Sequence, residues 1–204
     1  MKILAISDTI VDWIYSPRIR QIFSDVELVL GCGDLPAYYM EYIVSSLDVP
    51  LLHVNGNHSI PNEKLGHRYT DGTTDLHCKV VDYKGCTFAG IEGSIRYKDE
   101  GGYQYSQTGM WLNVFKIVPS LISNRIKYGR YLNVFITHAP AWGIHDQTDL
   151  AHRGIKAFRW VLTKFQPDYH LHGHIHVYRP DMITMTEFYK TKVVNVFGYR
   201  KLEL

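Results

Sequence analysis

The sequence has few cysteines and no long apolar run, and both absences restrict the class of protein. Among its 204 residues are only three cysteines, Cys32, Cys78 and Cys86, which form no metal-ligand spacing and indicate no disulfide framework. No apolar stretch is long enough to span a bilayer. The opening stretch, MKILAISD, reaches an aspartate too early for a signal peptide. We therefore expect a cytoplasmic protein with no membrane partner.

An excess of charge of one sign is also missing. The chain has 22 Lys and Arg against 20 Asp and Glu, so its formal net charge is +2. The chain has no basic stripe, so nucleic acid is not favoured as a partner. The composition is that of an ordinary globular protein, and the length suits one domain, which we expect to span residues 1–204. The oligomeric state is not indicated.

Histidine is the residue type that stands out, because four of the eleven histidines fall within HLHGHIH, residues 170–176. Alternate side chains of a strand share a face, so His170 and His172 should point the same way. Gly173 can then bend the backbone and re-aim His174 and His176. Imidazole is a common metal ligand and proton carrier, although a polar strand end with hydrogen-bonded histidines explains the cluster equally well.

The pattern of apolar residues predicts alternating strands and helices. Buried strands are expected at 2–7, 26–34 and 51–57, with helical segments between them, and a hairpin at 77–94. Residues 110–129 predict an amphipathic helix that is kinked or broken at Pro119. Its apolar face is expected to carry Trp111, Phe115, Val118 and Ile122. A helix over 150–165 and further strands complete a prediction of two packed sheets flanked by helices.

A side chain able to bind metal follows each buried strand. These residues are Asp8, Asp34, Asn57 with His58, His138, and then His174 and His176. Each has an ordinary explanation by itself, since aspartate caps helices and asparagine suits turns. Ligands of open α/β sheets, however, bind beyond the carboxyl ends of the strands. Together the residues predict a mixed oxygen and nitrogen site for Mn, Fe or Zn rather than Ca.

These residues lie in five short motifs, SDT, GCGD, GNHS, THAP and GHIH, spread along the chain. In order and spacing the motifs resemble those of the calcineurin-like metallophosphoesterases, and the resemblance covers about residues 2–198. It implies an α/β fold, a four-layer αββα sandwich of two mixed β-sheets flanked by helices. It also implies a two-metal site that hydrolyses a phosphomonoester or phosphodiester. The near-neutral net charge then favours a small phosphorylated substrate over nucleic acid.

The resemblance implies a role for each motif residue. The residues that match ligands of the first metal are Asp8, Asp34 and His176. Those that match ligands of the second metal are Asp34, Asn57, His138 and His174. Asp34 would then bridge two divalent transition metals, Mn, Fe or Zn. Metal-activated hydroxide would attack phosphorus, and His58, which matches the proton donor, would protonate the leaving group.

One position departs from the family pattern. The family's first motif is Asp-x-His, and here Ile10 stands in place of that histidine. The first metal would keep three protein ligands, which still suffices for a catalytic site, with weaker occupancy. Asp12 is the nearest replacement, although a solvent-exposed or helix-capping Asp12 is the better interpretation. Ser59 stands where many members have an acid that could orient His58.

Two other functions remain open. Ile10 favours a non-catalytic scaffold on the same fold, like the retromer subunit that resembles this family. The retained His58 and ligand histidines favour an enzyme, and a nuclease of the same family is a third hypothesis. Several residues near the motifs could contact the substrate or support the ligands, or could be ordinary loop residues. They are His145, Asp146, His152, Arg179, Tyr97, Tyr103 and Tyr105.

Overall fold

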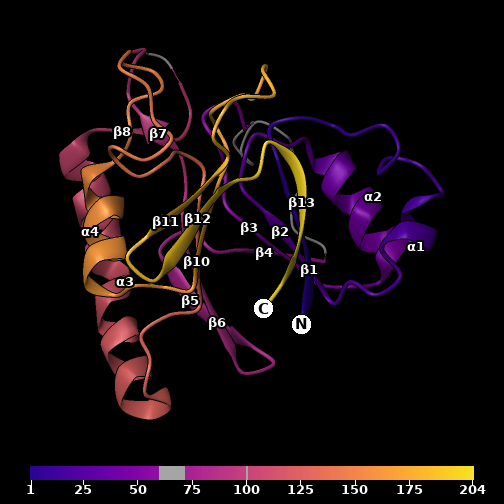
Figure 1. Cartoon of the computed structure of the whole chain (residues 1–204), viewed down its shortest axis with the longest axis horizontal. Coiled ribbons are helices and arrows are strands. Elements are labelled where there is room, and N and C mark those ends of the chain that lie inside the picture. Colours follow the sequence, from indigo (N-terminus) through magenta and orange to yellow (C-terminus); the bar gives the residue numbers. More distant parts are fainter. Residues whose placement is uncertain (60–71, 100) are drawn as a thin grey trace.

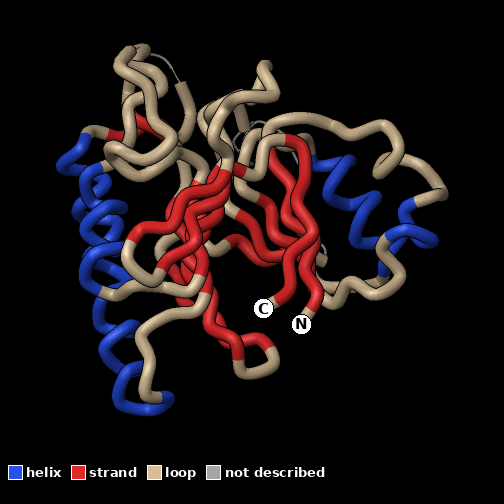
Figure 2. Tube along the Cα trace, viewed as in Figure 1, coloured by secondary structure: helices blue, strands red, loops and turns tan. Residues whose placement is uncertain are grey.

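Two large β-sheets pack face to face in the computed structural model, which describes residues 1–59, 72–99 and 101–204. Figure 1 shows helices α1 and α2 on the outer side of one sheet and α3 and α4 on the outer side of the other. The same four layers are visible in Figure 2 as blue helices on either side of the red strands. The predicted four-layer αββα sandwich of two mixed sheets is therefore confirmed.

The five-stranded sheet has the order β13-β1-β2-β3-β4. Its strands are β1 (Lys2–Ser7), β2 (Leu28–Gly31), β3 (Leu51–His53), β4 (Thr73–Asp75) and β13 (Gly198–Glu203). The strands β1, β2, β3 and β4 run parallel, and β13 pairs antiparallel with β1. The predicted strands at 26–34 and 51–57 are shorter than expected, because their last residues form loops at the carboxyl ends.

The six-stranded sheet has the order β11-β12-β10-β9-β6-β5. Its strands are β5 (Lys79–Tyr83), β6 (Cys86–Ile91), β9 (Val134–Thr137), β10 (Tyr169–His172), β11 (Met185–Phe188) and β12 (Thr191–Asn195). The strands β6, β9, β10 and β12 are parallel, and the predicted hairpin at 77–94 is confirmed as β5–β6. A separate pair, β7 (Ser94–Ile95) and β8 (Gln104–Tyr105), lies in the following loop.

The central core lies between the two sheets. Fully or almost fully buried side chains from both sheets meet there, among them Ile3, Leu30, Leu52, Phe88, Ile136 and Leu171. Two further clusters lie beneath the helices on the outer faces. Parallel strands that are covered on both faces need apolar residues at nearly every position. This requirement explains the short continuous apolar runs in the sequence.

The helices are α1 (Ile19–Ile22), α2 (Ala37–Leu47), α3 (Gln107–Tyr128) and α4 (Lys156–Lys164). Helix α3 continues through Pro119, so the expected break is wrong, while the kink that was the other expectation stays a prediction. Pro119 is exposed, so the carbonyl that loses its N–H partner at the proline can reach water. No helix among the described residues is long and apolar enough to cross a membrane.

The predicted apolar face of α3 is also wrong. The side chains that α3 buries are Met110, Asn113, Val114, Ile117 and Leu121. Phe115 and Ile122, which were expected on the apolar face, are 50% and 49% exposed. Both faces of this helix are apolar, and the sequence pattern alone did not indicate which of them meets the sheet.

Candidate metal centre

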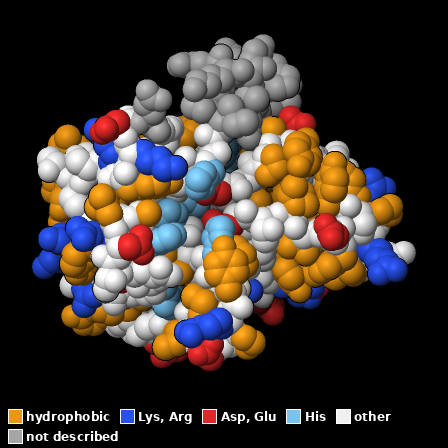
Figure 3. Space-filling view, turned by 90° about the horizontal axis from the view of Figure 1, so that it is seen from above, with side chains coloured by type: hydrophobic (Ala, Val, Ile, Leu, Met, Phe, Trp, Pro, Cys, Tyr) orange, Lys and Arg blue, Asp and Glu red, His pale blue; other side chains and the backbone are white. Residues whose placement is uncertain are grey.

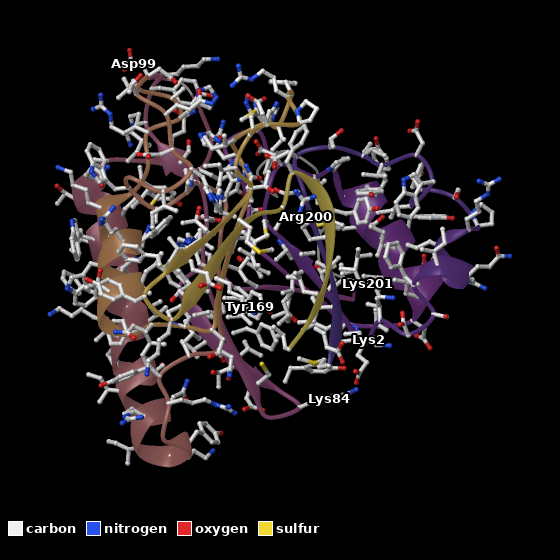
Figure 4. All side chains as sticks on the ribbon, viewed as in Figure 1. Lys2, Lys84, Asp99, Tyr169, Arg200 and Lys201 are labelled. Carbon is white, nitrogen blue, oxygen red and sulfur yellow. The ribbon has the colours of Figure 1, made fainter. Side chains whose placement is uncertain are left out.

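The carboxyl ends of the parallel strands from both sheets meet at one edge of the molecule. Asp8 directly follows β1, Asp34 follows β2 and His138 directly follows β9. Figure 3 views this edge and shows pale-blue histidines beside red carboxylates between the two halves. In Figure 4 the labelled Lys2, at the start of β1, lies at the other end of the five-stranded sheet, well away from Asp99. The two sheets therefore bring residues from distant parts of the sequence to one place.

Three of the predicted ligands have a strained backbone. The φ angles of Asp8, Asp34 and His174 are 66°, 56° and 68°, in the left-handed region that residues other than glycine rarely adopt. Such conformations cost on the order of 1–3 kcal/mol each and cluster at functional sites. Here the reversal at each strand end turns the side chain back toward the gap between the sheets.

His138 and His174 face each other with fixed tautomers. The Nδ1 atom of His138 lies 2.9 Å from the carbonyl oxygen of Cys32, and Nε2 of His174 lies 2.8 Å from that of Ala151. A carbonyl oxygen only accepts, so each of these nitrogens donates a proton. The nitrogens left over, Nε2 of His138 and Nδ1 of His174, are 3.1 Å apart. In neutral rings both carry lone pairs, and two such atoms require a cation between them.

Two oxygen atoms complete this group. The Oδ1 atom of Asn57 lies 3.0 Å from Nε2 of His138, and Oδ2 of Asp34 lies 3.2 Å from the same nitrogen. Asn57 presents its oxygen here because its Nδ2 donates to the hydroxyl of Tyr97 at 3.1 Å. Ligand bonds of about 2.0–2.2 Å place neighbouring donor atoms about 2.8–3.6 Å apart in an octahedral or tetrahedral coordination shell. The four atoms predicted to bind the second metal have this spacing around His138.

The electrostatics of this group favour a positive charge within it. Burial raises the pKa of Asp34, but His138 and the backbone N–H of His58 outweigh that effect and lower it to about 2. Burial lowers the pKa of His138, but the neighbouring carboxylate of Asp34 reverses this and raises it to about 9. Burial and the charge on His138 lower the pKa of His174 to about 3. A single cation, a proton or a metal ion, therefore suits this group.

Asp8 lies beside these atoms with one oxygen unsatisfied. Its Oδ1 accepts the backbone N–H of His174 at 2.9 Å, while the buried Oδ2 has no hydrogen-bond partner among the described residues. Burial raises the pKa of Asp8. Asp8, Asp34 and His138 each offer a ligand atom within 4.8 Å of one another. The buried Oδ2 of Asp8, which lacks a hydrogen-bond donor among the described residues, is therefore suited to bind a cation.

His176 lies at the edge of the site. Its Nε2 is 4.0 Å from Oδ1 of Asp8, and its Nδ1 is 2.6 Å from the hydroxyl of Tyr178. Ile10 offers no ligand atom and packs against the core cluster beneath α1 and α2. Asp12 is exposed, as the better interpretation of the sequence anticipated. His176 therefore lies near Asp8, and its role with Asp8 and Asp34 as a ligand of the first metal stays a prediction.

Glycines beside the ligands leave room that a larger residue would take. A Cβ atom on Gly33 would lie 2.5 Å from Nδ1 of His138, and one on Gly173 would lie 2.5 Å from Oδ2 of Asp8. A Cβ atom on Gly56 would collide with Oδ1 of Asp34. The glycines in the motifs GCGD, GNHS and GHIH are therefore required by this close packing.

His58 is exposed beside the group of ligands. Its backbone N–H donates to Oδ1 of Asp34 at 2.7 Å, which ties the loop of His58 to the expected bridging carboxylate. Ser59 accepts the backbone N–H of Gly56 through its hydroxyl at 2.9 Å. Ser59 therefore closes the turn before His58. The role of His58 as proton donor stays a prediction.

Tyr97 orients Asn57, a role that the sequence did not predict. The loop that carries Tyr97 is held by a second connection, in which Tyr105 donates to Oε1 of Glu92 at 2.6 Å. The other oxygen of Glu92 accepts the amide of Asn55 at 3.0 Å. The tyrosine-rich loop was visible in the sequence, but nothing in it showed that Tyr97 and Asn57, forty residues apart, are hydrogen-bonded.

The remaining histidines of the cluster lie behind the site. His170 is buried in the sheet, 2.9 Å from the hydroxyl of Thr137 and stacked on Phe135. His172 and His145 are joined by a contact of 2.9 Å between ring nitrogens. Burial lowers the pKa of His145 to about 4 and that of His170 to about 3. These rings are neutral at neutral pH.

A cavity of about 450 Å³ opens beside His176. The side chains that line it are Gln147, His152, His176, Tyr178, Arg179 and Met182. The ring of His152 also lies 5.3 Å from that of His174, centroid to centroid. The cavity is therefore lined by one predicted ligand, His176, and lies next to His174 through His152, and it offers cationic and aromatic groups to a bound molecule.

The fold and this set of donor atoms are those of a metallophosphoesterase. Residues 1–178 match the model of the calcineurin-like phosphoesterase family, and the chain belongs to that family. Its members generally bind divalent metals and hydrolyse phosphoesters. No curated protein gives a significant match to the sequence.

Solved structures show the same fold at low sequence identity. One crystal structure matches with a TM-score of 0.67 and 15% identity over 98% of this chain and 94% of that chain. The protein TT1561 of Thermus thermophilus matches with a TM-score of 0.62 and 15% identity over 97% of this chain and 89% of that chain. GAP50, the anchor in the inner membrane complex of Plasmodium, matches with a TM-score of 0.52 and 10% identity over 97% of this chain and 71% of that chain.

Proposed function

We propose that the protein hydrolyses a small phosphodiester or phosphomonoester with two divalent transition metals, Mn, Fe or Zn. The observation that carries this proposal is the set of three ligand atoms that surround Nε2 of His138 at 3.0–3.2 Å. Asp34, Asn57, His138 and His174 would hold one metal. Asp8, His176 and the shared Asp34 would hold the other, with weaker occupancy because Ile10 provides no ligand.

Bound cations would neutralise the charge of the phosphoryl group and make an attacking water more acidic. Two side chains of the protein, Asp34 and His58, have the remaining roles in this proposal. Asp34 would be shared by both groups of ligands, and its Oδ1 accepts the backbone N–H of His58 at 2.7 Å. The side chain of His58 is exposed beside them, where it can donate a proton to the leaving group.

The surroundings of the site favour a small substrate. The adjoining cavity of about 450 Å³ has the size of a small-molecule site. Arg179 at its wall supplies a positive charge, while the chain as a whole has a net charge of only +2. We propose that this cavity receives the leaving group, and that the protein acts in the cytoplasm on a soluble phosphorylated compound.

The second candidate function is a non-catalytic scaffold, which Ile10 favours. A hydrolysis assay separates the two functions. Purified protein with Mn²⁺ and bis-p-nitrophenyl phosphate is compared with the variants His58→Ala and Asp34→Ala. Loss of a general acid lowers rates by about 10²–10⁴-fold, and loss of Asp34 should abolish turnover. The control Asp12→Ala removes an exposed carboxylate outside the site and should retain full activity.

Each outcome of the assay has a definite meaning. Hydrolysis that depends on His58 and Asp34 supports the proposed mechanism. Hydrolysis that neither substitution changes contradicts it. Metal binding without any hydrolysis would favour the scaffold.

A further inference from the structure

The outer face of α3 carries a continuous apolar row. Leu112, Phe115, Ile122 and Ile126 are 61%, 50%, 49% and 83% exposed, and Pro119 between them is exposed as well. Single exposed apolar residues are normal, but a contiguous row indicates an interaction surface. In Figure 1 this helix lies at the outer edge of the molecule, and its last turns extend beyond the neighbouring α4.

The spacing of the row is that of a helix pairing surface. Its members follow one another at intervals of three, four, three and four residues, which is the a/d pattern of a helix that packs against another helix. The opposite face of α3 is occupied by the body of the protein, through Met110, Val114, Ile117 and Leu121. The row therefore points away from the core of its own chain.

The two ends of α3 differ in chemistry. Its first turns carry the aromatic pair Trp111 and Phe115, whose ring centroids lie 5.6 Å apart. Its last turns carry Arg125 and Lys127, and the helix has no acidic residue. Aromatic faces attract cations, while basic groups repel one another. The aromatic end of one such helix therefore complements the basic end of another.

We propose that a second copy of this chain docks along α3 in the antiparallel direction, with Pro119 near the twofold axis. A symmetric dimer needs a surface that complements itself under a twofold rotation. The row meets this requirement, because Leu112 and Ile126 lie seven residues on either side of Pro119. Antiparallel pairing also sets Trp111 opposite Lys127, each eight residues from Pro119, whereas parallel pairing would set like charges together.

The oligomeric state in solution tests this dimer. Sedimentation velocity of the whole protein should show a dimer at about 100 µM or below, in the micromolar range of ordinary transient complexes. Ile122→Glu and Ile126→Glu each place a charge in the row and should weaken dimerisation by about tenfold or more. The matched control is Ile22→Glu on α1, where the isoleucine is 46% exposed on the other side of the molecule.

Any of three results would overturn the proposal. They are a monomeric parent protein at the highest of these concentrations, dimers that the α3 substitutions leave intact, and dimers that Ile22→Glu also disrupts. Binding to an acidic partner or to anionic vesicles by a monomeric protein would assign the row to another occupant. Circular dichroism and hydrolysis should be unchanged in all variants, because α3 contributes no residue to the metal centre.

The direction of pairing is tested by disulfide cross-linking under mild oxidation. Antiparallel pairing predicts cross-links between Leu112→Cys and Ile126→Cys when the two variants are mixed. It predicts none when Leu112→Cys is oxidised alone. Efficient cross-linking of Leu112→Cys with itself would show parallel pairing and contradict the proposed geometry.

Discussion

The Nε2 atom of His138 lies 3.1 Å from Nδ1 of His174, and each ring already donates its other N–H to a backbone carbonyl. The proton positions follow from the carbonyls of Cys32 and Ala151, which can only accept. Lone pairs that face each other at this distance repel unless a cation lies between them. A proton on Nε2 of His138 or a metal ion between the rings meets this requirement, and the nearby oxygens of Asn57 and Asp34 fit a metal ion.

Metal removal should destabilise the folded protein. A ligand at about 100 times its dissociation constant stabilises a protein by about 2.7 kcal/mol. Thermal unfolding with Mn²⁺ should therefore occur at a higher temperature than after treatment with a chelator. The variant His138→Ala, which loses the central nitrogen of the group, should show no such response. A shift of equal size in the variant would mean that the ion binds elsewhere.

Tyr97→Phe should weaken the second metal position. Without the phenolic hydroxyl, nothing in this contact holds the Asn57 amide with its oxygen toward His138. Partners of this kind typically change metal affinity by about 10–100-fold. Calorimetric titration with Mn²⁺ measures the change, and Tyr128→Phe, on the exposed end of α3, is the matched control. Unchanged affinity in Tyr97→Phe would show that Asn57 needs no such support.

Ile10→His should strengthen the first metal position. The substitution restores the side chain that the family pattern places there, beside Asp8 and its unsatisfied oxygen. Calorimetry should then resolve a second, tighter binding event, which the control Ile10→Leu should lack. If the histidine variant binds no more tightly than the parent, the backbone at residue 10 does not point into the site.

Gly173→Ala should disrupt the site by crowding. The added Cβ would meet Oδ2 of Asp8 at 2.5 Å and collide with the hydroxyl of Ser7. Contacts this close force the strand end to move, at a cost of about 1–3 kcal/mol. Gly109→Ala in α3 meets only ordinary contacts of 3.4 Å and beyond, so it serves as the control. Metal affinity should fall in the first variant and persist in the second.

Acid should destabilise the protein partly through His170. Burial lowers its pKa to about 3, below the ordinary value of 6.5, so the folded state keeps the ring neutral while the unfolded state takes up a proton. Above about pH 6.5 the ring is neutral in both states, so His170 costs the protein no stability. As pH falls from about 6.5 toward 3, the free energy of unfolding decreases by up to about 1.4 kcal/mol per pH unit. Urea unfolding between pH 7 and 5 should show a shallower loss for His170→Gln, and parallel curves would contradict this assignment.

The sequence predicted much of the fold and the location of the site for physical reasons. Buried parallel strands appear as short apolar runs, and the polar residue that ends each run marks the edge where ligands bind. The register of long-range contacts is not visible in this way. The hydrogen bond of Tyr97 to Asn57 and that of His174 to the carbonyl of Ala151 join loops whose approach depends on the whole fold.

Helix α3 shows the limit of the periodic pattern. Trp111, Phe115, Val118 and Ile122 share one helical face, and Met110, Val114, Ile117 and Leu121 share another. Packing against α4 and against strands β5, β6 and β8 decides which of them is buried. A helix with two apolar faces is ambiguous by pattern alone.

Anomalous diffraction from crystals grown with Mn²⁺ tests the central claim most directly. We expect a strong peak between Nε2 of His138, Nδ1 of His174, Oδ1 of Asn57 and Oδ2 of Asp34, and a weaker peak beside Asp8 and His176. Crystals that hold Mn²⁺ elsewhere, with no peak between these four atoms, would contradict the account.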